Sequence, residues 1–293
     1  MSLSLEFIVT FGTLAAAAVA LWVPAPEMRG SRTWLWAPLL TLACLAGVVT
    51  GFLTWQAPSW LALFAAVATA AKRSSNRWVR VPLLALTWLA PLLFAAHRFP
   101  GFMNPVLAEQ VRFSADAAPY TVRSSFDMAA VGIILAGVFC SRISKAEDWL
   151  QMLRQVWPVV VSTLVVVLGL GVILGFVRPD FKWTPYSAFF LGTNLLFTCV
   201  TEEAYFRGFT YAGLAAAMSK WRFGAVAAGV VSALLFGIAH VKGGPLLIFL
   251  ATVAGLHYAA AYAVCKRVEG AIVTHFALNA VHFVAFTYPN LSS

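Results

Sequence analysis

The sequence predicts an all-α, polytopic membrane helix bundle with about eight to ten transmembrane helices. Three observations predict this fold class. Hydrophobic residues make up 61% of the 293 residues and charged residues only 11%, whereas a soluble domain carries about 25% charged residues. The mean hydropathy is +0.84. The apolar residues form continuous runs rather than alternating with polar ones, which argues against a transmembrane β-barrel.

Ten apolar segments could cross, or nearly cross, the hydrocarbon core of a bilayer, for which about 20 helical residues suffice. The third and fifth segments are short, and either could be tilted, re-entrant or buried against neighbouring helices. The first segment lacks a basic n-region and ends in Pro-Ala-Pro, so we expect a retained span rather than a cleaved signal peptide. The segments are residues 5–23, 35–54, 59–71, 80–96, 127–141, 157–177, 186–206, 223–241, 246–264 and 270–286.

The basic residues predict the orientation of the helices. Thirteen of the 20 Lys and Arg residues fall in alternate connections, six fall in the other connections, and Arg207 lies inside a segment. This bias places the thirteen-residue side in the cytoplasm and both termini outside. It also accounts for the net charge of +9, so we expect the lipid bilayer, and no nucleic acid, as a partner. The thirteen are Arg29, Arg32, Lys72, Arg73, Arg77, Arg80, Arg142, Lys145, Arg154, Lys220, Arg222, Lys266 and Arg267.

The longest polar stretch, residues 97–126, lies on the non-cytoplasmic side in this topology. At about thirty residues it exceeds ordinary loop length, so we expect it to have some structure of its own. It could cover an opening for substrate or join two helix bundles. We predict a division into N-terminal membrane helices with this extracytoplasmic loop (1–126) and a membrane-embedded core (127–293).

Two adjacent glutamates, Glu202 and Glu203, lie in an apolar segment that continues to Arg207. Ionisable groups within a span are costly and usually mark function. On an α-helix Glu203 and Arg207 share a face, whereas Glu202 points about 100° away. We therefore expect Glu203 to pair with Arg207 as a structural brace, and Glu202 to face another partner as a general base or acid.

Two further motifs carry imidazole and amide groups. His240 ends an apolar run, and an imidazole beside Glu202 would position and polarise a water molecule. His275 and Asn279 lie one helical turn apart in the last segment and are donors suited to an oxyanion in a dry site. A general base, a water-orienting imidazole and an oxyanion clamp are the groups needed to hydrolyse an amide without a covalent intermediate.

Each of these features has another interpretation. The Glu203–Arg207 pair could serve packing alone, His240 could cap a helix, and Asn279 could join two helices by hydrogen bonding. Buried Glu and His side chains also occur in transporters and proton relays. A metal site built from Glu202, His240 and His275 is chemically possible. The occurrence of three motifs on three separate apolar segments favours the hydrolytic interpretation.

Three motifs follow one another in the last third of the chain: Glu202-Glu203-x-x-x-Arg207, Phe236-x-x-x-His240 and His275-x-x-x-Asn279. This ordered set resembles the motifs of the CPBP family, the CAAX proteases and bacteriocin-processing enzymes formerly called Abi. The best-known members are the type II CAAX prenyl endopeptidases. The resemblance covers residues 185–286, and the five or so preceding spans depart from the shorter members of the family.

The resemblance implies an intramembrane glutamic endopeptidase that needs no metal or other cofactor. By the family's mechanism, Glu202 and His240 activate water, and His275 and Asn279 stabilise the oxyanion. Glu203 and Arg207 support the site. The implied substrate is a peptide or protein of the membrane, and the expected location is a bacterial inner membrane. The alternative is a non-catalytic membrane protein, such as a bacteriocin immunity factor, scaffold or transporter, that keeps the family's cavity.

Overall fold

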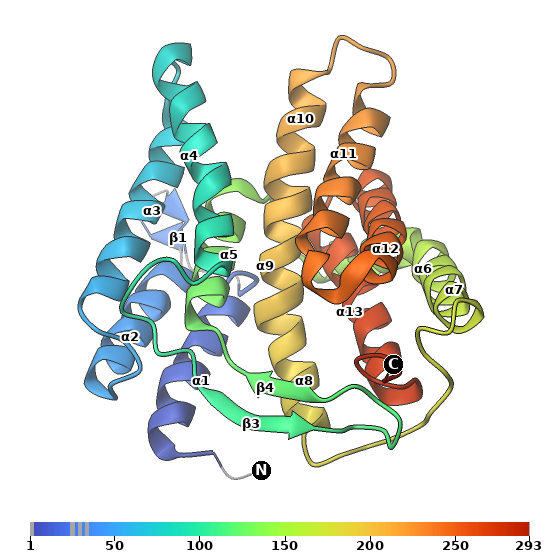
Figure 1. Ribbon diagram of the computed structural model, residues 1–293. Helices are drawn as coiled ribbons and strands as arrows, with labels where there is room; N and C mark the ends of the chain where they lie inside the picture. Colours follow the sequence, from blue (N-terminus) through green and yellow to red (C-terminus); the bar gives the residue numbers. More distant parts are fainter. Residues whose placement is uncertain (1–2, 24–26, 29–30, 33–34, 293) are drawn as a thin grey trace. The chain divides into compact units, whose positions relative to one another are not determined.

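The computed structural model describes residues 3–23, 27–28, 31–32 and 35–292 and confirms the all-α polytopic fold class (Figure 1). Within these residues, each of the ten predicted segments coincides with a helical run. The Pro-Ala-Pro sequence at 24–26 and Arg29, which contributed to the predictions of a retained span and of orientation, lie outside the described residues.

In the described part of its first half, the chain forms five helices and two pairs of short strands. The helices are α1 (Leu5–Val19), α2 (Trp36–Val49), α3 (Gln56–Arg73), α4 (Arg77–Ala95) and α5 (Phe126–Phe139). Strands β1 (Glu27–Met28) and β2 (Ser31–Arg32) form one two-stranded sheet, and β3 (Val106–Val111) and β4 (Tyr120–Arg123) form another. The second sheet confirms that the 97–126 stretch has structure of its own.

The second half contains two long composite helices and three further helices. The first composite helix comprises α6 (Ala146–Thr163), the π-helical segment η1 (Leu164–Leu168) and α7 (Gly169–Ile173). The second comprises α8 (Ser187–Thr193), η2 (Asn194–Cys199), α9 (Val200–Glu203), η3 (Ala204–Tyr211) and α10 (Ala212–Ala217), of which η2 and η3 are π-helical. The remaining elements are α11 (Gly224–Ala239), the short 3₁₀ turn η4 (Val241–Gly243), α12 (Gly244–Cys265) and α13 (Val268–Ala285).

Among the described residues, four helical runs are long and apolar enough to cross a membrane, namely Arg77–Ala95, Ala146–Ile173, Val241–Cys265 and Val268–Ala285. Four shorter apolar helices are α1, α2, α5 and α11. The chain is therefore an integral membrane protein, and the exact number of crossings stays a prediction. The run Ala146–Ile173 begins before the apolar segment that starts at 157, and Glu147 and Asp148 in its first turn suit a helix N-terminus. The amphipathic pattern of residues 142–156 predicts a helix there, at the membrane interface, and the structure joins this helix to the following apolar segment.

The chain divides into two compact units, and each is described by itself. The first comprises residues 1–105, 123–144 and 196–205. Its most buried helix is α5, of which every residue from Ala129 to Ala136 is buried. At Gly132 an added Cβ would lie 2.0 Å from Oγ1 of Thr201, so α5 and α9 approach closely only because this position is glycine. The fifth apolar segment is thus a helix buried against its neighbours, which is one of the predicted alternatives.

A polar cluster joins the end of α4 to the start of α5 in this first unit. Asp127 is 1% exposed, and its carboxylate accepts hydrogen bonds from Asn104 Nδ2 at 3.0 Å and from His97 Nδ1 at 2.7 Å. The Asn104 side-chain oxygen accepts from the backbone N–H of Phe126 at 2.8 Å. These bonds satisfy a carboxylate that would otherwise be costly to bury.

The second unit comprises residues 106–122, 145–195 and 206–293, with α12 packed against α6, α11 and α13. Small residues allow α11 and α12 to pack closely. A Cβ added at Gly237 would lie 1.9 Å from Oγ1 of Thr252, and one added at Gly255 would lie 3.1 Å from Cα of Ala233. Close approach through small residues is the usual means of joining helices in a membrane.

Aromatic packing fixes one end of α8 and α13 in the second unit. Phe190 of α8 stacks on Phe283 of α13 with ring centroids 4.0 Å apart, and Phe113 and Val122 of the β3–β4 region complete the cluster. The segment after α13 bridges back to the loop before α8 through Pro179 and Phe286. Asn279 lies one helical turn before Phe283 in α13, so this aromatic packing also fixes the part of the helix that carries Asn279.

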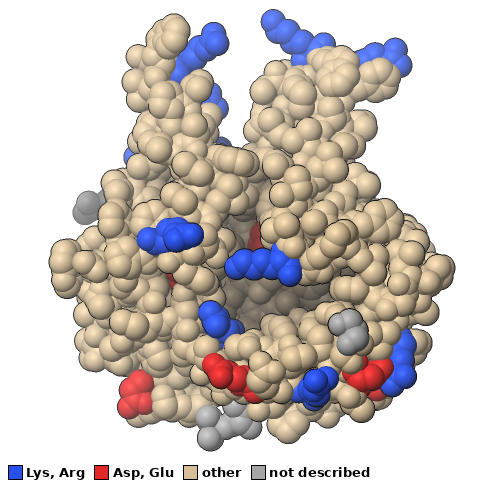
Figure 2. All heavy atoms as spheres, viewed as in Figure 1, with Lys and Arg blue, Asp and Glu red and all other residues tan. Residues whose placement is uncertain are grey.

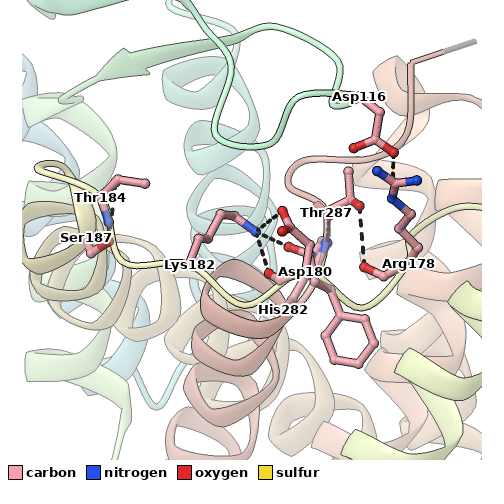
Figure 3. Close-up of polar contacts among 9 residues, drawn as sticks. Asp116, Arg178, Asp180, Lys182, Thr184, Ser187, His282 and Thr287 are labelled. Carbon is pink, nitrogen blue, oxygen red and sulfur yellow. Dashed lines mark hydrogen bonds and ion pairs between the residues drawn. The ribbon is translucent and has the colours of Figure 1, made fainter.

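Charged side chains reinforce the same loop (Figure 3). Arg178 Nε lies 2.7 Å from a carboxylate oxygen of Asp116, and Lys182 donates to Asp180 and to the backbone oxygen of Phe286. The Ser114 hydroxyl, and then the Lys182 ammonium, hold the pKa of Asp180 below its usual value. Burial lowers the pKa of Lys182. Lys182 thus caps the C-terminal carbonyl groups of α13, where a cation is favourable.

Candidate active site

The six predicted site residues lie on four helical regions. Glu202 and Glu203 end α9, and they belong to the first unit. The other four belong to the second unit: Arg207 in η3, His240 directly after α11, and His275 and Asn279 in α13. The parts of the site are described below within each unit.

The two glutamates differ in burial. Glu203 is 0% exposed, whereas Glu202 is partly exposed. This difference agrees with the predicted division between a buried support and a carboxylate that can meet a reactant. The pairing of Glu203 with Arg207 itself stays a prediction.

Hydrogen bonds on both sides of the glutamates hold α9 in the first unit. Oγ1 of Thr201 donates to the backbone oxygen of Met128 at 3.1 Å, and the hydroxyl of Tyr205 donates to the backbone oxygen of Trp88 at 2.9 Å. Glu202 and Glu203 thus sit between two side chains that are tied to α5 and α4.

The helix that carries the glutamates is not a regular α-helix. The π-helical segments η2 and η3 stand directly before and after α9. From Ala204 onward the backbone hydrogen bonds run from residue i to i+5 rather than to i+4. The shared face of Glu203 and Arg207, which we predicted from α-helical geometry, therefore stays a prediction. Short π-helical stretches inside helices occur frequently at functional sites.

Arg207 lies in an aromatic cage within the second unit. The side chain is 0% exposed, and Cζ lies 4.7 Å from the ring centroid of Phe236, 5.1 Å from that of Tyr258 and 5.7 Å from that of Phe206. Nη2 donates to the backbone oxygen of Gly255 at 2.9 Å. A guanidinium over aromatic faces gains cation–π stabilisation, which grows when the group is desolvated.

The same rings hold His275. Its imidazole is 3% exposed and stacks on Tyr258, with ring centroids 4.5 Å apart and an interplanar angle of 17°. The Phe236 ring meets the imidazole edge-on at 5.7 Å and 88°. Arg207 and His275 therefore share two aromatic neighbours, and the cage couples the position of the guanidinium to that of the imidazole.

The Phe236 residue also orients His240. The two rings lie 4.7 Å apart, and Nδ1 of His240 lies 2.8 Å from the backbone oxygen of Phe236. A carbonyl oxygen can only accept a hydrogen bond, so Nδ1 carries the hydrogen. In the neutral ring Nε2 is then the nitrogen with the lone pair, which can accept a hydrogen bond from water.

Asn279 has a partner that the sequence did not identify. Its Nδ2 group donates to Oδ1 of Asn194, the first residue of η2, at 3.2 Å. A polar amide inside an apolar segment was the available signal for Asn194, because such residues usually bond across helices in membranes. Tyr258 gave no comparable signal, since an aromatic residue in a span is ordinary.

The second unit thus brings Arg207, His240 and His275 together around the rings of Phe236 and Tyr258. Asn279 follows His275 by one turn of α13. Among the described residues, the structure contains no group of three His, Cys, Asp or Glu side chains that could hold a metal ion. The imidazoles of His240 and His275 and the side-chain amide of Asn279 offer nitrogen atoms that can form hydrogen bonds with a reactant.

Comparison with known proteins identifies a family model that matches the region carrying these residues. Residues 182–281 match a family model described as type II CAAX prenyl endopeptidase Rce1-like. The match contains all six predicted site residues and confirms the predicted resemblance to the CPBP family of CAAX-type membrane proteases. Neither a curated protein nor a solved structure matches the chain.

Proposed function

We propose that this chain is an intramembrane endopeptidase of the glutamic type, which hydrolyses a peptide bond of a membrane-associated peptide or protein. The observation that carries the proposal is the match over residues 182–281, which contains the three motifs in order. The organisation of Arg207, His240 and His275 around shared aromatic rings supports it. We further propose that the protein resides in a bacterial inner membrane.

In the proposed reaction, Glu202 is the general base. It removes a proton from a water molecule that is held by Nε2 of His240, and the resulting hydroxide attacks the carbonyl carbon of the scissile amide. Proton transfer to a positioned side chain of this kind contributes roughly 10²–10⁴ in rate. The tautomer set by the backbone oxygen of Phe236 supports this role for His240.

Attack of hydroxide moves the electron pair of the C=O bond onto oxygen. We assign the stabilisation of this oxyanion to N–H donors of His275 and Asn279, since one such donor is worth about 10²–10³ in rate. When the C–N bond breaks, Glu202 returns its proton to the leaving nitrogen. The oxyanion re-forms the C=O bond as the C–N bond breaks, and the products are a carboxylic acid and an amine, which exchange a proton to become a carboxylate and an ammonium group. No covalent enzyme intermediate forms.

Three residues have positioning roles in this proposal. Arg207 braces the rings that hold both imidazoles, and Glu203 supports the same helix. Asn194 accepts one N–H of Asn279 and thereby fixes the direction of the amide group. A fixed donor stabilises a transition state better than a mobile one, because it needs no reorganisation during the reaction.

The experiment that tests this proposal compares cells that express the wild type, Glu202→Gln or Glu147→Gln in a strain that lacks the endogenous gene. The Gln side chain keeps the shape of Glu but cannot act as a base. Glu147→Gln makes the same chemical change in the first turn of α6, outside the matched region. New protein N-termini in membrane and secreted fractions are identified by mass spectrometry.

We expect the same set of new N-termini with the wild type and with Glu147→Gln, and none of them with Glu202→Gln. Equal amounts of the three proteins in the membrane must be verified by immunoblotting. Identical N-termini in all three strains would instead favour the non-catalytic alternative, in which the protein binds a peptide or partner helix.

A further inference from the structure

The turn between α3 and α4 gathers basic side chains at one end of the first unit. Lys72 and Arg73 end α3, and Arg77 and Arg80 lie in the first turn of α4. All four are exposed, and Figure 2 shows Lys and Arg side chains at the free end of this helix pair. We call residues 72–80 the α3–α4 tip.

Acidic residues are far from this tip in the sequence, and its arginines have no acidic partner among the described residues. The sequence contains no Asp or Glu between Met28 and Ala108. In the part of the chain that the structure describes, none of Arg73, Arg77 and Arg80 forms an ion pair. Three arginines without an ion-pair partner, together with the neighbouring Lys72, create a local positive potential that attracts anions.

Helix stability does not account for the two arginines at the start of α4. The first turn of a helix carries partial positive charge, so it favours carboxylates and disfavours cations. The first turn of α4 contains no acidic residue. A cation at this position is unfavourable within the protein alone, and a negatively charged group from outside would offset that cost.

Apolar side chains next to the cations indicate what kind of anion is involved. Trp78 is 85% exposed, Val79 49% and Val81 55%. These residues begin the run Arg77–Ala95, which is long and apolar enough to cross a membrane. An exposed indole at the end of such a helix lies at the level of the lipid headgroups, and basic side chains there reach into the same layer.

We propose that the α3–α4 tip binds anionic phospholipids, with Arg73, Arg77 and Arg80 contacting headgroup phosphates and Trp78 lying among the upper acyl carbons. Juxtamembrane clusters of four or more basic residues attract anionic lipids in this way. Lys72 contributes less, because its ammonium lies 5.7 Å from the ring centroid of Phe139 in the same unit. The binding surface is separate from the six candidate active-site residues and does not depend on the proposed protease activity.

The experiment is native mass spectrometry of the full-length protein, purified in detergent and titrated with phosphatidylglycerol or with phosphatidylcholine of the same acyl chains. We expect tighter binding of phosphatidylglycerol, with an affinity that falls as ionic strength rises. The double variant Arg77→Gln/Arg80→Gln should bind phosphatidylglycerol about 30-fold more weakly, from roughly fivefold for each basic residue near an anionic surface. Its binding of phosphatidylcholine should not change.

The matched control is Lys220→Gln/Arg222→Gln, which removes the same charge from exposed positions in the turn between α10 and α11. Arg222 already lies over the ring of Phe223, with Cζ 4.3 Å from the centroid. We expect this variant to lose no more than the roughly fivefold share of one basic residue, because that turn carries two cations rather than four and Arg222 already lies over a ring. Equal losses in both double variants would overturn the proposal, because binding would then follow net charge alone.

Two further results would also overturn it. A wild-type protein that binds phosphatidylcholine as tightly as phosphatidylglycerol has no headgroup selectivity. Displacement of phosphatidylglycerol by inorganic phosphate would identify a free anion, rather than a lipid, as the ligand. The melting temperature of Arg77→Gln/Arg80→Gln in phosphatidylcholine nanodiscs should not fall below that of the wild type, since neither arginine has an ion pair to lose and a cation in the first turn of a helix is unfavourable.

Discussion

Replacement of Arg207 by Lys tests whether the buried guanidinium braces the candidate active site. Lysine keeps the positive charge, but its compact ammonium cannot lie over two rings and also reach a backbone oxygen as the planar guanidinium does. In the structure, Cζ lies 4.7 Å from the Phe236 centroid and 5.1 Å from that of Tyr258, and Nη2 donates to Gly255 at 2.9 Å. The substitution should therefore lose one of the ring contacts and most of the hydrogen bond.

The expected loss follows from the burial of the group. A desolvated cation–π contact is worth about 2 kcal/mol, and a hydrogen bond to a charged donor about 1.5–3 kcal/mol. Since lysine retains part of each, we expect Arg207→Lys to reduce the free energy of unfolding by about 3 kcal/mol. At roughly 2 °C per kcal/mol for a large domain, the melting temperature should fall by about 6 °C.

The control is Arg222→Lys, which disrupts a cation–π contact of similar geometry at an exposed position. Arg222 Cζ lies 4.3 Å from the ring centroid of Phe223, which is 48% exposed. At an exposed site the contact is worth about 0.5–1 kcal/mol, so the melting temperature should fall by about 2 °C or less. Both variants are measured by tryptophan fluorescence on heating in nanodiscs. Equal melting temperatures for Arg207→Lys and Arg222→Lys would refute the bracing role.

Three further predictions follow from the same contacts. Gly255→Ala should destabilise the protein by about 1–3 kcal/mol in thermal unfolding, because the added Cβ would lie 3.1 Å from Cα of Ala233 on α11. An unchanged melting temperature would show that α11 and α12 can move apart at no cost in stability. Asn194→Ala should lower kcat without raising KM. It should have no further effect on kcat when Asn279 is already Ala, because Asn194 acts through the side-chain amide of Asn279. Additive effects in the double variant would contradict this role. The Ser114 hydroxyl and nearby cations lower the pKa of Asp180. The ionised form of Asp180 therefore stabilises the fold above the unfolded pKa of about 4, and this stabilisation is lost as the pH falls. Asp180→Asn should flatten the acid side of a plot of melting temperature against pH, and an unchanged slope would exclude this contribution.

The sequence predicted the helical segments well because each depends on a local property. Continuous apolar runs bounded by charged or turn residues specify helices almost independently of tertiary contacts. The boundary at 157 was less certain, because the amphipathic residues 142–156 predict a helix of their own. In the structure this helix, with Glu147 and Asp148 in its first turn, continues into the apolar segment. The structured loop between α4 and α5 was predictable from its length, but its strands were not.

The π-helical segments around Glu202 and Glu203 could not be predicted from composition. A change from i→i+4 to i→i+5 bonding depends on which packing arrangement stabilises the extra residue per turn. Tertiary bonds such as that from Tyr205 to Trp88 link residues that are far apart in sequence. A single sequence gives no information about such pairings.

The chemical groups of the candidate site were predictable, whereas their supports were not. Ionisable residues in apolar segments are rare, so Arg207, His240 and His275 attract notice in the sequence. Their common contacts with Phe236 and Tyr258 depend on the packing of α11, α12 and η3. The aromatic cage is therefore a result of the fold rather than of a recognisable motif.

The most direct test of the central claim uses purified protein in liposomes and the peptide sequence identified from the new N-termini. The rate of peptide-bond cleavage is measured for the wild type, Glu202→Gln and Glu147→Gln under single-turnover conditions. We predict that Glu147→Gln cleaves at the wild-type rate and that Glu202→Gln is slower by at least about 10²-fold, the lower limit for loss of a general base. Cleavage by Glu202→Gln at the wild-type rate would contradict the assignment of this carboxylate as the catalytic base.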